Sequence, residues 1–311
     1  QHYHPGKPIE ELQRELGLDE VIKLASNENP LGPGQSVLDA IAATKDLSRY
    51  PDGNGFTLKQ ALADKHNIDM DCITLGNGSN DVLEMTARAF VTAEHQVIYS
   101  QHSFAVYPIV TQAVGAEHVV IPADDWGHDL DAMLNAVTDK TRLMFIANPN
   151  NPTGTWVNSG RLRNVLESIP EHVIVLVDEA YFEYAQAEEN YPDSSLWLNE
   201  FKNLIVTRTF SKAYGLAGLR VGYALSHPDI ANLLNRVRQP FNNNSLALVA
   251  AETALQDTQY IEKSVQVNQS GMQQLITAFD DMGLEFIPSK GNFICVDFEQ
   301  PADDIYQALL H

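Results

Sequence analysis

Apolar segments of five to nine residues alternate with segments of helical periodicity along the first 240 residues. The apolar segments are hydrophobic at nearly every position, which is typical of strands that are buried on both faces. Strands that alternate with helices predict an α/β fold, in which a mostly parallel sheet is sandwiched by helices. The expected strands are residues 72–76, 95–100, 141–149, 172–180 and 203–211.

The pattern changes near residues 239–240. A long helical stretch is expected over residues 244–283, and a strand–turn–strand pair is expected over residues 284–298. This change of pattern predicts a second, smaller α+β domain. We therefore expect an N-terminal arm rich in Pro and Asn over residues 1–34, a large domain over residues 35–240, and an incomplete small domain over residues 241–311.

The composition places the chain among ordinary globular proteins, with 311 residues of which 44% are hydrophobic and 20% charged. The net charge of −21, with no basic cluster to offset it, argues against binding to nucleic acid or to an anionic membrane. No apolar run approaches the ~20 residues of a membrane helix. We expect small-molecule partners instead.

The two cysteines, Cys72 and Cys295, exclude a disulfide framework and indicate a reducing, cytoplasmic location. The ten histidines show no metal-binding spacing, so no metal site is expected. The sequence starts without Met and stops inside an expected helix, and we expect both ends to be trimmed.

Polar groups follow several of the expected strands. They occur at residues 76–80, 147–154, 178–181 and 209–212. Because ligands of α/β proteins bind beyond the carboxyl ends of the strands, these groups predict a ligand site at that edge of the sheet.

The first of these segments is a glycine turn, which includes Gly78 and leads to a helix expected to begin at Asn80 or Asp81. Backbone N–H groups at a helix start bind anions. Asp81 occupies the place of the third glycine of a dinucleotide-binding motif, which argues against that motif. A plain turn capped by Ser79 or Asn80 remains an alternative for this segment.

Asp178 ends the most apolar of the expected strands. A buried carboxylate needs a partner, so Asp178 either caps the next helix or accepts a cationic ligand nitrogen. Tyr181 would lie on the same side of one helical turn. Asn151 precedes Pro152, a candidate cis proline, and can direct its amide into the same cleft, although a tight loop would also explain this segment.

Lys212 stands at the start of an apolar, glycine-rich run. A lysine in a dry pocket has a lowered pKa and can act as a neutral nucleophile that forms a Schiff base with an aldehyde cofactor. That chemistry also needs a carboxylate for the pyridine nitrogen, donors for a phosphate and a stacking aromatic. The sequence offers Lys212 for the aldehyde, Asp178 for the nitrogen, Phe104 for stacking, and Gly78, Ser79, Asn80, Thr209, Ser211 and Arg220 for the phosphate.

These motifs are similar to those of the fold-type-I pyridoxal-phosphate aminotransferases, and within them to the histidinol-phosphate branch. The resemblance covers nearly the whole chain. It is carried by the strings KLASNENPLGP, RYPDG, GNGSND, NPNNPTG, VDEAY, TFSKAYGLAGLRVGY and RQPFNNNSLA. The resemblance implies pyridoxal 5'-phosphate as cofactor.

The resemblance also implies a role for individual residues. Lys212 would hold the cofactor and move the proton between it and the substrate's alpha carbon, while Asp178 would pair with the pyridine nitrogen. Tyr181 and Asn151 would contact the phenolic oxygen of the ring, and Asn151 would also face the substrate. The phosphate would be held by the groups named above.

Other implied roles involve the subunit interface and the substrate. Tyr50 would reach the phosphate of the neighbouring subunit's cofactor, which implies a homodimer with shared active sites. Tyr3 and Asn29 would approach the substrate. The sequence departs from the family in two respects: it ends before the basic C-terminal region whose arginine receives a carboxylate or the substrate phosphate, and it has Phe241 where some relatives have a tyrosine.

The implied reaction is amino transfer from L-histidinol phosphate to 2-oxoglutarate, which gives imidazole-acetol phosphate and glutamate in histidine biosynthesis. Three alternatives stay open at this point. They are a pyridoxal-phosphate-dependent lyase such as a threonine-phosphate decarboxylase, an aromatic amino acid aminotransferase, and a non-catalytic protein that keeps only the fold.

Overall fold

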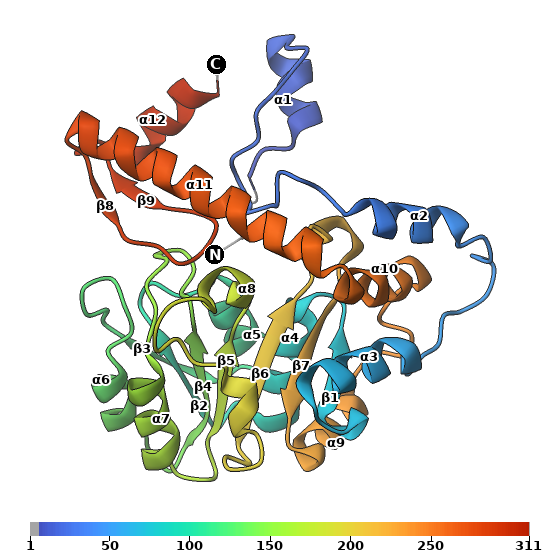
Figure 1. The fold of residues 1–311 in the computed structure, drawn as a ribbon. Helices are drawn as coiled ribbons and strands as arrows, with labels where there is room; N and C mark the ends of the chain where they lie inside the picture. Colours follow the sequence, from blue (N-terminus) through green and yellow to red (C-terminus); the bar gives the residue numbers. More distant parts are fainter. Residues whose placement is uncertain (1–5, 311) are drawn as a thin grey trace.

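The computed structural model describes residues 6–310. Its centre is a seven-stranded sheet with the strand order β1-β7-β6-β5-β4-β2-β3 (Figure 1). Neighbouring strands from β6 to β3 are parallel, so the expected mostly parallel sheet is confirmed. The strands are β1 Ile73–Gly76, β2 Gln96–Ser100, β3 Glu117–Ile121, β4 Thr141–Ala147, β5 Ile174–Asp178, β6 Leu204–Thr209 and β7 Gly222–Ser226.

Two strands of this sheet were not expected from the sequence. β7 runs antiparallel to both β6 and β1, because the chain returns from β6 through a short connection with no crossover helix. β3 is one of the two edge strands, and most of its residues are exposed or half-buried. It therefore lacks the continuous apolar run by which the other parallel strands were recognised.

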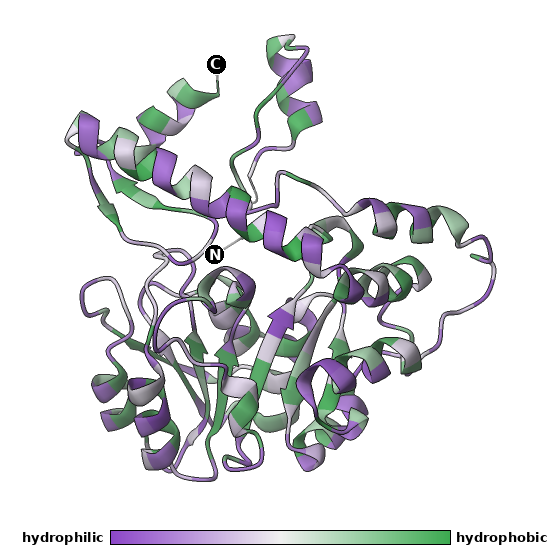
Figure 2. Cartoon of the chain, viewed as in Figure 1, coloured by the Kyte–Doolittle hydropathy of each residue, from purple (hydrophilic) through white to green (hydrophobic). Residues whose placement is uncertain are grey.

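Helices cover both faces of the sheet and bury two separate hydrophobic clusters. Figure 2 shows hydrophobic residues concentrated on the central strands and hydrophilic residues on the outer faces of the helices. One face is covered by α3 Phe56–His66, α6 Leu130–Asn135, α7 Ser159–Ser168 and α10 Ser245–Gln256. The other face is covered by α4 Ser79–Phe90, α5 Val106–Ala113 and α9 Pro228–Val237.

The C-terminal part of the chain lies above one end of the sheet (Figure 1). The expected strand–turn–strand pair is confirmed as the antiparallel strands β8 Glu285–Ile287 and β9 Cys295–Asp297. The long helical stretch is two helices, because Asp257 accepts a hydrogen bond from the Tyr260 N–H and starts a new helix. These are α10 and the 25-residue α11 Thr258–Met282, and α12 Ala302–Leu309 follows the strands.

The division of the chain at residue 240 stays a prediction. α10 follows that point in sequence, yet it packs against α3 and against α2 Gln35–Ala43. The N-terminal arm contains one helix, α1 Ile9–Leu16, and an extended segment that leads toward the carboxyl edge of the sheet. The remaining short elements are α8 Phe182–Ala185 and the 3-10 helices Met70–Cys72, Ser194–Trp197 and Ala217–Leu219.

A buried ion cluster ties the ends of β5 and β6 together. Arg208 Nη2 lies 2.8 Å from Glu179 Oε2 and 2.7 Å from Asp193 Oδ1. The side chains of Arg208 and Glu179 are only 2% and 0% exposed. Burial raises the pKa of Glu179, and the guanidinium of Arg208 opposes that shift. The cation therefore keeps a carboxylate ionised inside the protein.

We expect Arg208→Met to lower the free energy of unfolding by about 3–5 kcal/mol, because it leaves the Glu179 carboxylate buried without its cation. Urea denaturation followed by far-UV circular dichroism measures the change. Arg163→Met is the matched control, since the Arg163 ion pair with Glu167 is exposed and should contribute less than about 1 kcal/mol. Equal, small losses in both variants would contradict the prediction.

Candidate functional site

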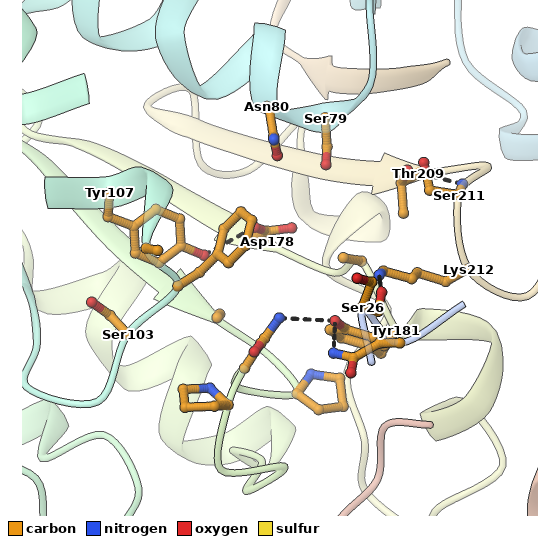
Figure 3. Close-up of a pocket in the computed structure, with 18 of the residues that line it drawn as sticks. Ser26, Ser79, Asn80, Ser103, Tyr107, Asp178, Tyr181, Thr209, Ser211 and Lys212 are labelled. Atoms are coloured by element: carbon orange, nitrogen blue, oxygen red, sulfur yellow. Dashed lines mark hydrogen bonds between the residues drawn. The ribbon is translucent and has the colours of Figure 1, made fainter. Parts of the chain in front are cut away.

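A cavity of about 400 Å³ opens at the carboxyl edge of the sheet (Figure 3). It is formed by the ends of β4, β5 and β6, by the start of α4, by the loop after β2 and by the N-terminal arm. Most residues predicted from the sequence line it together. These are Ser79, Asn80, Phe104, Asn151, Asp178, Tyr181, Thr209, Ser211, Lys212 and Arg220.

Asp178 is held by two hydroxyl groups at the end of β5. Tyr107 Oη donates to Oδ2 at 2.9 Å and Thr207 Oγ1 donates to Oδ1 at 3.0 Å. Burial raises the pKa of Asp178, whereas the two hydrogen bonds and the Lys212 amine oppose that shift. The helix-capping alternative does not apply, because Tyr181 is the residue at the N-cap of α8. Asp178 thus presents a hydrogen-bonded carboxyl group to the cavity.

Tyr107 is a site residue that the sequence did not reveal. It is fully buried on α5, its ring stacks on Phe145 at 4.4 Å between centroids, and Phe104 packs edge-on against it at 5.9 Å. Its hydroxyl therefore fixes the carboxylate of Asp178, while its ring supports the aromatic residue that lines the cavity. The only sequence signal is its position three residues after Phe104.

Lys212 follows β6 and points into the cavity (Figure 3). Its Nζ donates to the backbone oxygen of Ser26 at 2.9 Å. Burial lowers the pKa of Lys212 to about 8, and Arg220 also lowers it, whereas Glu28 and Asp178 raise it. The structure therefore supports the expectation that this amine is uncharged in part of its population near neutral to mildly alkaline pH.

One side of the cavity is built to hold an anion. α4 begins at Ser79, one residue earlier than expected, and follows Gly78 at φ 78°. A Cβ atom at Gly78 would collide with the guanidinium of Arg220, so the glycine allows the cation to lie against the helix start. Arg220 Nη1 also donates to Ser211 Oγ at 3.1 Å. Backbone N–H groups, hydroxyls and one cation thus converge, which suits a phosphate.

The opposite side carries Tyr181 and two amide side chains. Tyr181 Oη accepts hydrogen bonds from Asn151 Nδ2 at 2.9 Å and from Asn27 Nδ2 at 3.0 Å. Burial raises the pKa of Tyr181, and both amides oppose that shift. The Asn151-Pro152 peptide is cis, as the sequence suggested, and so is Asn148-Pro149.

Among the described residues that were predicted from the sequence, Asn29, Tyr50 and Gly78 do not line the cavity, and Gly78 only precedes the helix start that does. Asn29 donates through Nδ2 to Ser264 Oγ at 2.7 Å and to the backbone oxygen of Ala213 at 3.0 Å, so it anchors the arm. Tyr50 is 81% exposed and stacks on Phe241, away from Lys212 of its own chain. Tyr3 lies outside the described residues. The arm residues that do line the cavity are Ser26 and Asn27.

Comparison with known proteins shows to which protein family this chain belongs. The family model described as aminotransferase class I and II matches residues 19–311. The chain belongs to that aminotransferase family. Among the curated relatives, "Histidinol-phosphate aminotransferase 2" of Pseudomonas fluorescens is 58% identical over 99% of this chain and 84% of its own length. "Histidinol-phosphate aminotransferase 1" of Nitrosococcus oceani is 56% identical over 99% of this chain and 83% of its own length.

Solved structures agree with this family membership. Histidinol-phosphate aminotransferase from Sinorhizobium meliloti, crystallised in complex with pyridoxal-5'-phosphate, is 34% identical with a TM-score of 0.89, over 96% of this chain and 81% of that one. Aspartate aminotransferase from Thermus thermophilus is 19% identical with a TM-score of 0.83 and supports the fold alone.

Two further observations on residues 6–310 concern metal-binding groups and membrane-spanning helices. Within that range, no group of three or more His, Cys, Asp or Glu side chains is arranged to hold a metal ion. No helix of the same range is long and apolar enough to cross a membrane. His128 is buried, with Nε2 2.8 Å from the backbone oxygen of Ala147.

The amine of Lys212 should react with a small acylating reagent at a rate that rises with pH and reaches half of its plateau near pH 8, because only the unprotonated amine is a nucleophile and its pKa is lowered to about 8. Competitive labelling of the cofactor-free protein, read by mass spectrometry of the peptide that contains Lys212, measures this midpoint. Glu28→Gln removes an anion that raises the pKa, so the midpoint should fall. A midpoint near 10.5, the usual value for lysine, would contradict the prediction.

Proposed function

We propose that this protein is a pyridoxal-phosphate-dependent aminotransferase that transfers an amino group from L-histidinol phosphate to 2-oxoglutarate. The products are imidazole-acetol phosphate and glutamate. The observation that carries the proposal is the placement of Lys212 between a buried carboxylate, Asp178, and an anion-binding cluster around Arg220, all in one cavity. The names of the relatives at 56% and 58% identity support the choice of substrate.

The donors and acceptors of the cavity fit pyridoxal 5'-phosphate. The helix start at Ser79 and the cation of Arg220 suit its phosphate, and the anion of Asp178 suits a protonated ring nitrogen. Tyr181 and Asn151 supply polar groups for the ring oxygen, and Phe104 supplies an apolar surface. When bound, this cofactor withdraws electrons from the alpha carbon of an amino substrate.

Lys212 and Asp178 have different roles in the proposed reaction. Lys212 would hold the cofactor until the amine of the substrate takes its place, and its released, neutral Nζ could then accept the proton of the alpha carbon and return it at another position. Its lowered pKa leaves much of the amine unprotonated in mildly alkaline solution. Asp178 stays buried and hydrogen-bonded, so the positive charge of a ring nitrogen is favoured beside it. The alternative of a non-catalytic protein with this fold conflicts with an intact set of such groups.

Incubation of the full-length protein with histidinol phosphate and 2-oxoglutarate should produce glutamate. We expect Lys212→Ala to abolish this activity and to remove the site at which borohydride fixes the cofactor to the chain, because no other amine replaces Nζ. Enzymatic measurement of glutamate and mass spectrometry of the borohydride-treated protein provide the two readouts.

The same assay separates the alternative reactions. Release of carbon dioxide without an oxo-acid acceptor would indicate a lyase and contradict the proposal. Turnover of phenylalanine or tyrosine without turnover of histidinol phosphate would indicate an aromatic aminotransferase. Fixation of the cofactor on a residue other than Lys212 would overturn the assignment of the site.

We further propose a homodimer in which Tyr50 acts in the neighbouring subunit's site. Its exposed ring lies with Phe241 outside the cavity of its own chain, so a second subunit is needed to bring it near a cofactor. The substrates named above are the expected small-molecule partners. The cytoplasmic location expected from the sequence stays a prediction.

Hybrid dimers test whether Tyr50 acts across the interface. Tyr50→Ala and Lys212→Ala should each give a poorly active homodimer. A hybrid that pairs one subunit of each kind has one intact site, built from Lys212 of one chain and Tyr50 of the other, and should regain about half of the unsubstituted activity. Glutamate production by purified hybrids measures the gain, and hybrids as inactive as the parent variants would show that Tyr50 does not act in this way.

A further inference from the structure

The arm segment at residues 26–29 has an unusual backbone. Ser26 and Asn27 are consecutive non-glycine residues with positive φ angles, 72° and 53°. Asparagine adopts this conformation more readily than most residues, whereas serine gains little from it. A conformation of this kind persists where surrounding contacts hold it in place.

Contacts on three sides hold this segment. Asn29 ties the arm to α11 and to the backbone of Ala213, next to Lys212. Asn292, in the connection between β8 and β9, donates through Nδ2 to the backbone oxygen of Asn27 at 2.9 Å. The segment therefore enters the cavity in a fixed orientation, with the carbonyl of Ser26 at the amine of Lys212.

This orientation directs the side chain of Asn27 to Tyr181. Asn27 Nδ2 lies 3.0 Å from Tyr181 Oη, and Asn151 Nδ2 lies 2.9 Å from the same oxygen. Phe293, the residue after Asn292, packs edge-on against the Tyr181 ring at 5.1 Å between centroids. Tyr181 is only 3% exposed, so both its ring and its oxygen are fixed by neighbours.

The hydrogen-bonding capacity of a phenol gives this arrangement a consequence. A tyrosine hydroxyl can accept about two hydrogen bonds and donate one. Two amide donors use the accepting capacity of Tyr181 Oη, so only its proton is free to form a further bond. Among residues 6–310, no acceptor for that proton is found, and Tyr181 lines the cavity. The proton is therefore available to an acceptor atom inside the cavity.

We propose that Asn27 is a positioning residue: together with Asn151 it turns the Tyr181 hydroxyl so that its proton points at an anionic oxygen of the bound ligand. Asn292 holds Asn27 in the required place. The inference rests on the proposed function for the identity of that oxygen, the phenolic oxygen of pyridoxal 5'-phosphate. The sequence resemblance placed Asn29 near the substrate, whereas in the structure Asn27, two residues earlier, lines the cavity and Asn29 does not.

Asn27→Gly and Asn27→Asp are the variants of choice, because both residue types tolerate the positive φ angle and both lack the amide donor. The test uses the protein loaded with pyridoxal 5'-phosphate. The visible absorbance of the loaded protein is recorded as a function of pH, and the affinity for the cofactor is measured by equilibrium dialysis. Neither readout depends on turnover.

We expect Asn27→Gly to raise the pH midpoint of the absorbance change by about half a unit, because a donor that is less well aimed stabilises the anionic oxygen less. Affinity for the cofactor should fall about threefold. Asn27→Asp should raise the midpoint by about one unit, since the new carboxylate accepts a hydrogen bond from the Tyr181 hydroxyl and turns its proton away from the ligand. Asn292→Ala keeps the Asn27 amide but frees its backbone, and should give a smaller shift in the same direction.

Asn203→Ala is the matched control. Its amide is also half-buried and donates to the backbone oxygen of Val173, at the opposite edge of the sheet. We expect the control to leave the midpoint unchanged. An unmoved midpoint in both Asn27 variants, with the cofactor still bound on Lys212, would overturn this inference alone. A midpoint shift in Asn203→Ala as large as that in Asn27→Gly would also overturn this inference. Failure of the unsubstituted protein to bind the cofactor would overturn both the inference and the proposed function.

Discussion

The site depends on keeping a buried carboxyl group and a half-buried amine in the same cavity. Burial disfavours the charged form of each: it raises the pKa of Asp178 and lowers that of Lys212. The two groups partly offset each other, and the hydroxyls of Tyr107 and Thr207 add support to the anion. The result is a buried carboxyl group held by two hydrogen bonds, beside an amine that loses its proton more readily than an ordinary lysine.

The alternation of side chains along β5 and β6 allows the same strand ends to serve stability and chemistry. Asp178, which lines the cavity, pairs across the two strands with Thr207, whose hydroxyl donates to it. The next residues, Glu179 and Arg208, form an ion pair buried on the other side. Because the strands are fixed from that side, the groups that face the ligand need little support from the ligand itself.

Much of the fold and of the site could be predicted from the sequence. Continuous apolar runs identified the buried parallel strands, and the polar residues at their ends met in one cavity, as the rule for α/β sheets requires. β3 was missed because it is an edge strand whose residues are mostly exposed or half-buried. β7 is fully buried, but it follows a glycine-rich loop and its sequence GYALS has only three hydrophobic residues in a row. Tyr107 and Asn27 were missed because their partners lie 71 and 154 residues away in sequence. Local pattern carries no information about contacts of that kind, and only the positive φ angles of Ser26 and Asn27 bring the side chain of Asn27, and not that of Asn29, to the cavity.

The antiparallel return of β7 has a mechanical consequence. The connection from β6 to β7 carries both Lys212 and Arg220, so one short loop braced by two paired strands presents the amine and the cation. The groups above the cavity, by contrast, come from the arm and from the connection between β8 and β9. A cofactor bound to that loop would stay in place if the arm and the β8–β9 connection moved away from the cavity. Movement of these segments could therefore let a substrate enter or leave without release of the cofactor.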